Sequence, residues 1–192
     1  MQMHNCLQSA VAKQVLLLID WENLFYGLFR RFGAEEMRIE ARIKKLMDWI
    51  KTDIGELLGG YGFVFAPEHL SYRHQQTCVE DKLRLMICPK KHFVEPRTNP
   101  KTGDSVTEED TVDETIIWFT KTMVRHPNFK CICLVSGDSD YIPLLEEMPQ
   151  YGIKRALAIP TIDCLSKNRE LTSFADRSPI TDKKMLMRLD NI

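Results

Sequence analysis

The chain has 192 residues, of which 44% are hydrophobic and 28% are charged, and its formal net charge is −1. This composition is typical of a globular protein and predicts one domain. A net charge so close to zero excludes a general electrostatic attraction to nucleic acids or membranes, so any such binding must use local patches. The first residues lack the charged region of a signal peptide, and no apolar stretch is long enough to span a bilayer. We therefore expect a cytoplasmic protein with no membrane partner.

Five short apolar runs are predicted to be strands, because each is bounded by turn residues or by a change of periodicity. They cover residues 15–19, 61–66, 84–88, 131–135 and 154–159. The six cysteines include no Cys-x-x-Cys pair, and Cys131 and Cys133 lie in the fourth of these strands. We interpret them as reduced core thiols rather than as a zinc or disulfide framework.

Helical spacing of apolar residues lies between and after these runs. It predicts helices over 24–32, 35–58, 72–83, 112–125, 140–151 and 185–189. Residues 90–109 show no periodicity, which predicts a long loop. Strands that alternate with helices are typical of an α/β protein with a parallel sheet covered on both faces. The order 3-2-1-4-5, with strands numbered along the chain, makes the first and fourth strands neighbours and opens a crevice at their carboxyl ends.

Four aspartates lie where this topology can bring them together. Asp20 ends the first strand, Asp138 and Asp140 follow the fourth, and Asp113 starts the helix before the fourth. Carboxylates in one crevice repel one another unless a cation neutralises them, and an all-oxygen ligand set favours Mg²⁺ or Mn²⁺. Such a metal centre is suited to phosphodiester hydrolysis by water. Taken alone, the Ser-Gly-Asp-Ser-Asp segment is better explained as a turn and a helix N-cap. Taken alone, Asp20 is about as often an ordinary loop residue as a metal ligand.

Four short segments resemble a known family. Asp20-Trp21-Glu22-Asn23 is similar to the opening D-x-x-N motif of the NYN domain family, which belongs to the PIN-like nuclease superfamily, and Val112-Asp113 resembles its second motif. Ser136-Gly137-Asp138-Ser139-Asp140-Tyr141 closely resembles its S-G-D-S-D-F/Y signature, and Phe174-Ala175-Asp176 its tail motif. The resemblance spans residues 15 to 176, and the third motif is the most specific.

The resemblance implies a three-layer PIN-like fold and a metal-dependent ribonuclease that acts on single-stranded RNA. It implies that Asp20, Asp113, Asp138 and Asp140 bind Mg²⁺ or Mn²⁺ and that Asn23 orients a substrate phosphate. It divides the chain into an N-terminal extension (1–14), a nuclease domain (15–180) and a C-terminal tail or short helix (181–192). The sequence does not decide whether the protein forms a homodimer.

The region before the second motif changes sign sharply. Six basic residues between 82 and 101 precede six acidic residues between 104 and 114. We interpret the basic part as an arm for the nucleic-acid backbone, although a solvated loop explains it about as well. The candidate substrate-binding residues are Trp21, Ser136, Lys90, Lys91, Arg97 and Lys101. Trp21 could stack a base beside Asp20 or pack in the core.

Two other functions remain open. The family often has Lys-Gly before its Val-Asp, whereas this chain has Asp110-Thr111. The loss of a cation there favours a catalytically weak module that binds RNA or a protein partner. A phosphatase with a nucleophilic aspartate would need Asp-x-Asp after the first strand, but Glu22 occupies the third position.

Overall fold

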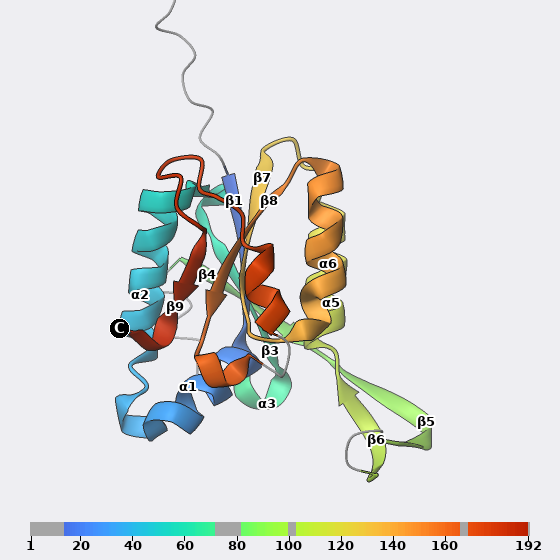
Figure 1. Cartoon of the computed structure of the whole chain (residues 1–192). Coiled ribbons are helices and arrows are strands. Elements are labelled where there is room, and N and C mark those ends of the chain that lie inside the picture. Colours follow the sequence, from blue (N-terminus) through green and yellow to red (C-terminus); the bar gives the residue numbers. More distant parts are fainter. Residues whose placement is uncertain (1–13, 72–81, 100–102, 166–168, 192) are drawn as a thin grey trace, which may run out of the picture.

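A parallel sheet forms the middle layer of the computed structural model, which describes residues 14–71, 82–99, 103–165 and 169–191. Its strands follow the order β4-β3-β1-β7-β8-β9, and the short β2 pairs with the start of β1. All of these pairs are parallel (Figure 1). The strands are β1 Gln14–Asp20, β2 Glu56–Leu57, β3 Gly62–Pro67, β4 Leu83–Cys88, β7 Phe129–Val135, β8 Lys154–Ile159 and β9 Leu186–Arg188.

Helices cover both faces of the sheet because side chains of a strand alternate between its faces. On one face, β1 residues such as Leu17 and Ile19 pack with α1 and α2. On the other, Leu16 and Leu18 pack with α5 and α6. The α-helices are α1 Trp21–Glu36, α2 Ile39–Trp49, α3 Glu68–Ser71, α5 Val112–Met123 and α6 Ile142–Glu147. Single 3₁₀ turns cover Leu58–Gly60, Ser139–Tyr141, Met148–Tyr151, Ile162–Cys164, Arg169–Phe174 and Leu189–Asn191.

The five predicted strands are present in their predicted order, and the α/β class is confirmed. The predicted strand count was wrong, because β2 and β9 extend the sheet. These strands have two and three residues. Runs this short carry no period of their own, so pairing with a neighbour decides that they are strands.

Two predicted helices were also wrong in extent or type. The helix predicted over 35–58 divides into α2 and a π-helical turn, Ile50–Ile54, which ends at Gly55 with φ 157°. The helix predicted over 185–189 is instead β9 followed by a 3₁₀ turn. The helix predicted over 72–83 falls mostly outside the described residues. None of the described helices is both long enough and apolar enough to cross a membrane.

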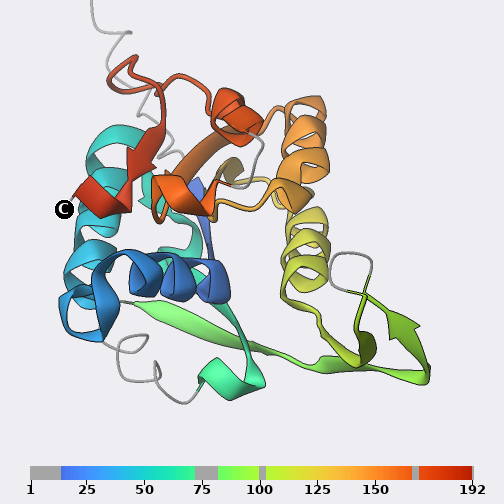
Figure 2. The same ribbon diagram turned by 60° about the horizontal axis from the view of Figure 1, so that its bottom comes forward.

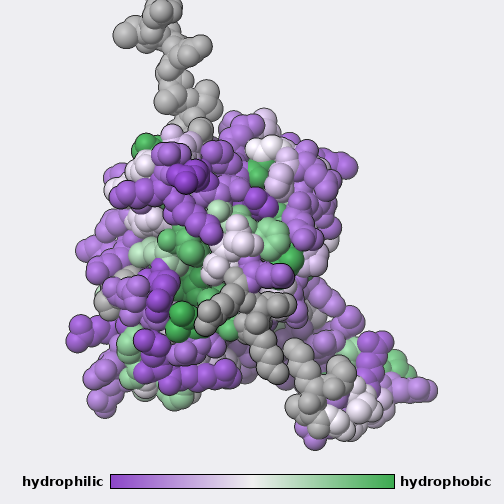
Figure 3. Space-filling model, viewed as in Figure 1, coloured by the Kyte–Doolittle hydropathy of each residue, from purple (hydrophilic) through white to green (hydrophobic). Residues whose placement is uncertain are grey.

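The predicted loop over 90–109 is mostly an antiparallel hairpin of β5 Lys90–Thr98 and β6 Ser105–Asp110. It projects from the body of the molecule (Figure 2), and nearly all of its side chains are exposed. Because neither face is buried, its sequence shows no alternation of apolar and polar residues. Hydrophilic residues also dominate the face of the body in Figure 3, with hydrophobic ones gathered near its centre.

Candidate metal centre

The four predicted acids all lie at the carboxyl-terminal edge of the sheet. Asp20 is the last residue of β1 and the N-cap of α1, and Asp113 lies in the first turn of α5. Asp138 and Asp140 follow β7, the neighbour of β1, and the register pairs Ile19 with Val135. Parallel strands end at the same edge, which explains why residues more than a hundred positions apart meet here.

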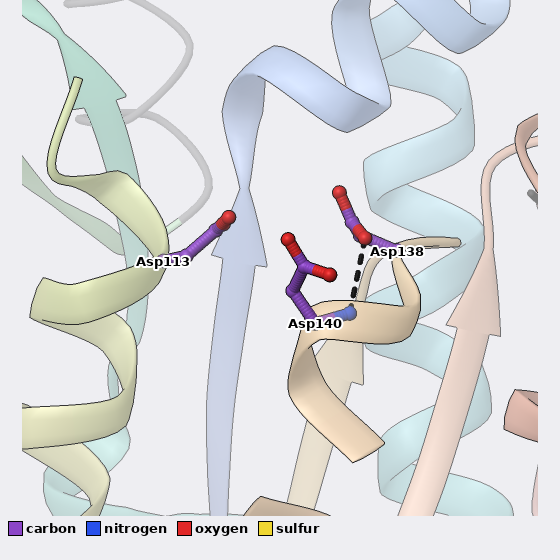
Figure 4. Close-up of side chains that lie close together, drawn as sticks. All are labelled: Asp113, Asp138 and Asp140. Carbon is purple, nitrogen blue, oxygen red and sulfur yellow. Dashed lines mark hydrogen bonds between the residues drawn. The ribbon is translucent and has the colours of Figure 1, made fainter. Parts of the chain in front are cut away.

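Three of the acids form a compact group. Asp113, Asp138 and Asp140 each offer a carboxylate oxygen, and these oxygens all lie within 4.8 Å of one another. Figure 4 shows Asp113 pointing from α5 toward the other two. The backbone N–H of Asp140 donates to Asp138 Oδ1 at 3.0 Å, so Asp138 caps the 3₁₀ turn and Asp140 remains exposed. A hydrogen-bonded cap uses one oxygen of Asp138 and leaves the other free to bind a ligand.

Asp20 lies apart from this group and is almost fully buried, with 4% of its surface exposed. Its carboxylate accepts hydrogen bonds from the Asn23 N–H at 3.0 Å and from Ser136 Oγ at 3.1 Å. Burial, together with the nearby charge of Asp113, nevertheless outweighs these hydrogen bonds and raises the pKa of Asp20 to about 7. A group of this kind ionises near neutral pH in the absence of a cation.

Tyr141 connects Asp20 to the group of three. Its ring is completely buried, and its hydroxyl lies 2.5 Å from Asp113 Oδ1 and 3.2 Å from Asp20 Oδ2. Burial raises the pKa of Asp113, whereas the hydrogen bond from Tyr141 opposes that change. The sequence analysis missed this residue, because an aromatic side chain after the two aspartates also fits the buried stripe of a helix.

The loop that carries Asp138 is held against α1. Asn23 Oδ1 accepts a hydrogen bond from the Gly137 N–H at 2.8 Å, and Ser136 Oγ accepts one from the Asp138 N–H at 3.1 Å. A Cβ atom on Gly137 would lie 2.7 Å from the carbonyl oxygen of Cys164, so this close approach requires glycine. These contacts fix the carboxylates before any ligand binds.

Two of the predicted substrate-binding residues, Trp21 and Ser136, are buried and do not face a substrate. Of the two alternatives open for Trp21, the structure favours the core: its exposed fraction is 0%, and this first residue of α1 packs in the hydrophobic core. Ser136 is equally buried and supports the loop, so it has no free surface for a substrate.

The predicted basic arm belongs to the hairpin. Lys90 is paired with Glu108 at 2.9 Å and Lys91 with Glu114 at 3.2 Å. Arg97 stacks over the ring of Phe93 at 4.3 Å, and Lys101 lies outside the described residues. Each of the two lysines therefore already has a carboxylate partner.

A cleft of about 380 Å³ opens beside the acids. Its lining includes Asp20, Asp113 and Asp138, together with Asn23. It also includes residues that the sequence analysis did not select, namely Glu22, Tyr26, Gly27, Arg30, Asp110, Val112, Asp163 and Cys164. The cleft joins the carboxyl edge of the sheet to one side of α1.

The order of the sheet, with helices on both faces and acids at its carboxyl edge, is that expected of the PIN-like nuclease superfamily. Within it, the NYN domain family matches residues 14–180, and the chain belongs to that family. No curated protein matches the chain. The family is one of nuclease-like proteins that act on RNA and typically depend on divalent metals.

Proposed function

We propose that this protein is a metal-dependent ribonuclease that hydrolyses phosphodiester bonds of single-stranded RNA at the acidic edge of its sheet. The observation that carries the proposal is the group formed by Asp113, Asp138 and Asp140, whose oxygens lie within 4.8 Å of one another. Membership of a nuclease family supports the same reaction class.

The donor set fits a hard cation. All three side chains offer carboxylate oxygens, the ligands that Mg²⁺ and Mn²⁺ prefer, and no histidine or cysteine belongs to the group. Asp113 is partly buried, and the pKa values of Asp20 and Asp113 are both raised. A cation would relieve this unfavourable burial of negative charge.

Asp113, Asp138 and Asp140 would hold the ion, which when bound supplies a Lewis acid and water of lowered pKa. Asp20 would orient the site through its hydrogen bonds from Tyr141 and Ser136. Asn23 would keep the Asp138 loop closed through Gly137. The open cleft gives the scissile phosphate access to the same carboxylates.

A non-catalytic module is the second candidate, because of the charges around the cleft. Asp110 lines it, and this is the position at which the family often has a lysine. Among the described lining residues six are acidic and only Arg30 is basic. This balance would weaken the binding of a phosphate wherever the acids are not neutralised.

Cleavage of a labelled single-stranded RNA, in the presence of Mg²⁺ or Mn²⁺, tests the proposal. We expect Asp138→Asn and Asp20→Asn to abolish cleavage, and Asp48→Asn, an equal change of charge on the exposed face of α2, to retain it. Undiminished metal-dependent cleavage by both site variants would refute the nuclease. Calorimetric titration with Mn²⁺ distinguishes the nuclease from the non-catalytic module. A protein that shows no heat of binding near millimolar Mn²⁺ cannot be the proposed enzyme.

A further inference from the structure

One side of α1 forms a wall of the acidic cleft. Asn23, Tyr26, Gly27 and Arg30 all line the cleft, and their spacing of three, one and three residues places them on a single helical stripe. At a rise of about 1.5 Å per residue, the stripe extends roughly 10 Å beyond Asn23. The cleft therefore continues away from the aspartates along the helix.

Arg30 is the basic group of this wall. Within the described part of the chain it forms no ion pair, and its side chain is exposed. Its neighbour Arg31 differs, because it is paired with Asp163 at 3.0 Å and with Asp190 at 3.6 Å. A guanidinium in a cleft rich in carboxylates that pairs with none of those described can bind an anionic ligand.

Tyr26 lies one turn before Arg30 and is partly buried. Its ring meets that of Phe25 edge-on, with centroids 5.5 Å apart and an interplanar angle of 81°. This packing fixes the ring while part of it still lines the cleft. A fixed aromatic surface beside a free arginine is suited to an unpaired base and its phosphate.

The opposite wall approaches α1 closely. A Cβ atom on Gly27 would lie 2.2 Å from Cys164 Sγ, so the turn Ile162–Cys164 lies directly against the helix. The resulting cleft of about 380 Å³ has the size of a small-ligand site. Its volume is enough for part of one nucleic-acid strand.

We propose that α1 guides the substrate strand away from the metal centre, with Arg30 bound to a backbone phosphate and Tyr26 stacked on an unpaired base. This inference rests on the proposed function in assuming that the substrate is single-stranded RNA. It assigns the backbone contact to α1 instead of to the lysines of the hairpin.

Fluorescence anisotropy with a labelled oligouridylate tests the assignment, in Mn²⁺ and in the Asp20→Asn background so that the RNA stays intact. We expect Arg30→Ala to weaken binding about tenfold. It should also reduce the slope of log affinity against log salt by about 0.7, the value for one lost phosphate contact on a single strand. Tyr26→Leu, which keeps an apolar side chain but removes the ring, should weaken binding about fivefold or more with an unchanged slope.

Lys45→Ala on α2 is the matched control, because it removes the same charge from an exposed position outside the cleft. The inference is overturned if Arg30→Ala and Lys45→Ala have the same affinity and slope, or if the background protein binds no RNA. Cleavage by the wild-type protein is measured separately. If the wild-type protein cleaves RNA but Arg30→Ala does not change RNA binding, only this inference is refuted. If Arg30→Ala weakens RNA binding but the wild-type protein does not cleave RNA, only the proposed nuclease function is refuted.

Discussion

At the scale of single residues, the hydroxyl of Tyr141 occupies a position that two carboxylates share. A phenol has one proton, so it can donate to Asp113 or to Asp20 but not to both at once. The shorter contact, at 2.5 Å, is the one to Asp113. Tyr141 therefore orients a proposed metal ligand, and phenylalanine at this position would not.

Tyr141→Phe should weaken Mn²⁺ binding. The variant keeps the buried ring but loses the hydrogen bond that holds Asp113, and its loss leaves the pKa of Asp113 higher, so that protons compete better with the metal. We expect an affinity roughly tenfold lower by calorimetry, equivalent to about 1.4 kcal/mol. Tyr151→Phe, which changes an exposed tyrosine, is the control. Equal affinities for the two variants would contradict the orienting role.

The raised pKa of Asp20 predicts how stability depends on pH in the metal-free protein. Its carboxyl titrates near 7 in the folded state, whereas the ordinary value is 3.8. Between these values the folded state keeps a proton that the unfolded state has lost, so the free energy of unfolding falls as pH rises from about 4 to 7. Asp20→Asn removes this dependence.

Urea unfolding in a chelator, at pH 5 and at pH 8, checks this expectation. Wild-type protein should lose more stability between the two conditions than Asp20→Asn, by about 1 kcal/mol or more, since one unit of pKa shift corresponds to about 1.4 kcal/mol. A parallel loss in both proteins would show that Asp20 does not control the pH dependence.

At the scale of elements, two glycines allow the turn Ile162–Cys164 to close against the site. Gly27 on α1 and Gly137 after β7 both approach Cys164 too closely for a side chain. The contact at Gly137 is with backbone atoms and the one at Gly27 is mainly with Cys164 Sγ. Only the second can therefore be relieved by changing a side chain.

Gly27→Ala should destabilise the protein by about 1–3 kcal/mol through overpacking, even though alanine favours helix. In Gly27→Ala/Cys164→Ala the sulfur is gone, and the next contact, 3.2 Å to Pro160 Cβ, is tight but tolerable. Adding Gly27→Ala to Cys164→Ala should therefore cost much less stability than adding it to the wild-type protein. Additive effects in thermal or urea unfolding would show that the two residues do not clash.

At the scale of the whole molecule, the last residues complete the core. Met185 and Leu189 are buried with β1, α1 and α2, and β9 pairs with β8. The buried Arg42 donates to the Leu189 carbonyl and, at 2.7 Å, to that of Met37. The segment after residue 180, which the family match does not include, therefore packs against the domain.

Leu189→Ala should lower the free energy of unfolding by about 2–5 kcal/mol, the usual cost of a buried leucine. Ile180→Ala, at a position that is 57% exposed, should cost less than about 0.5 kcal/mol. Urea unfolding of both variants measures the difference. Similar values would mean that the C-terminal segment contributes little to the stability of the core.

The main strands and their order were predictable from the sequence because each is a short apolar run with its own local signal, and all but β4 are mostly buried. The hairpin was not, since no face of it is buried and its lysines pair with acids instead of forming an alternating pattern. The sequence left the position of Trp21 open between the cleft and the core for a related reason. A large aromatic residue beside Asp20 has the same sequence context whether it faces the cleft or the core.

By itself, the sequence determined the α/β class, the five principal strands and the four aspartates that follow or precede them, because periodicity and turn residues act over short distances. The tertiary structure alone decided the rest. Tyr141 bridges two carboxylates, Asp20 lies outside the group of the other three, and Arg30 and Tyr26 line their cleft. These relations join residues far apart in the chain, such as Asp20 and Ser136, and exist only once the strands have paired and brought their ends together.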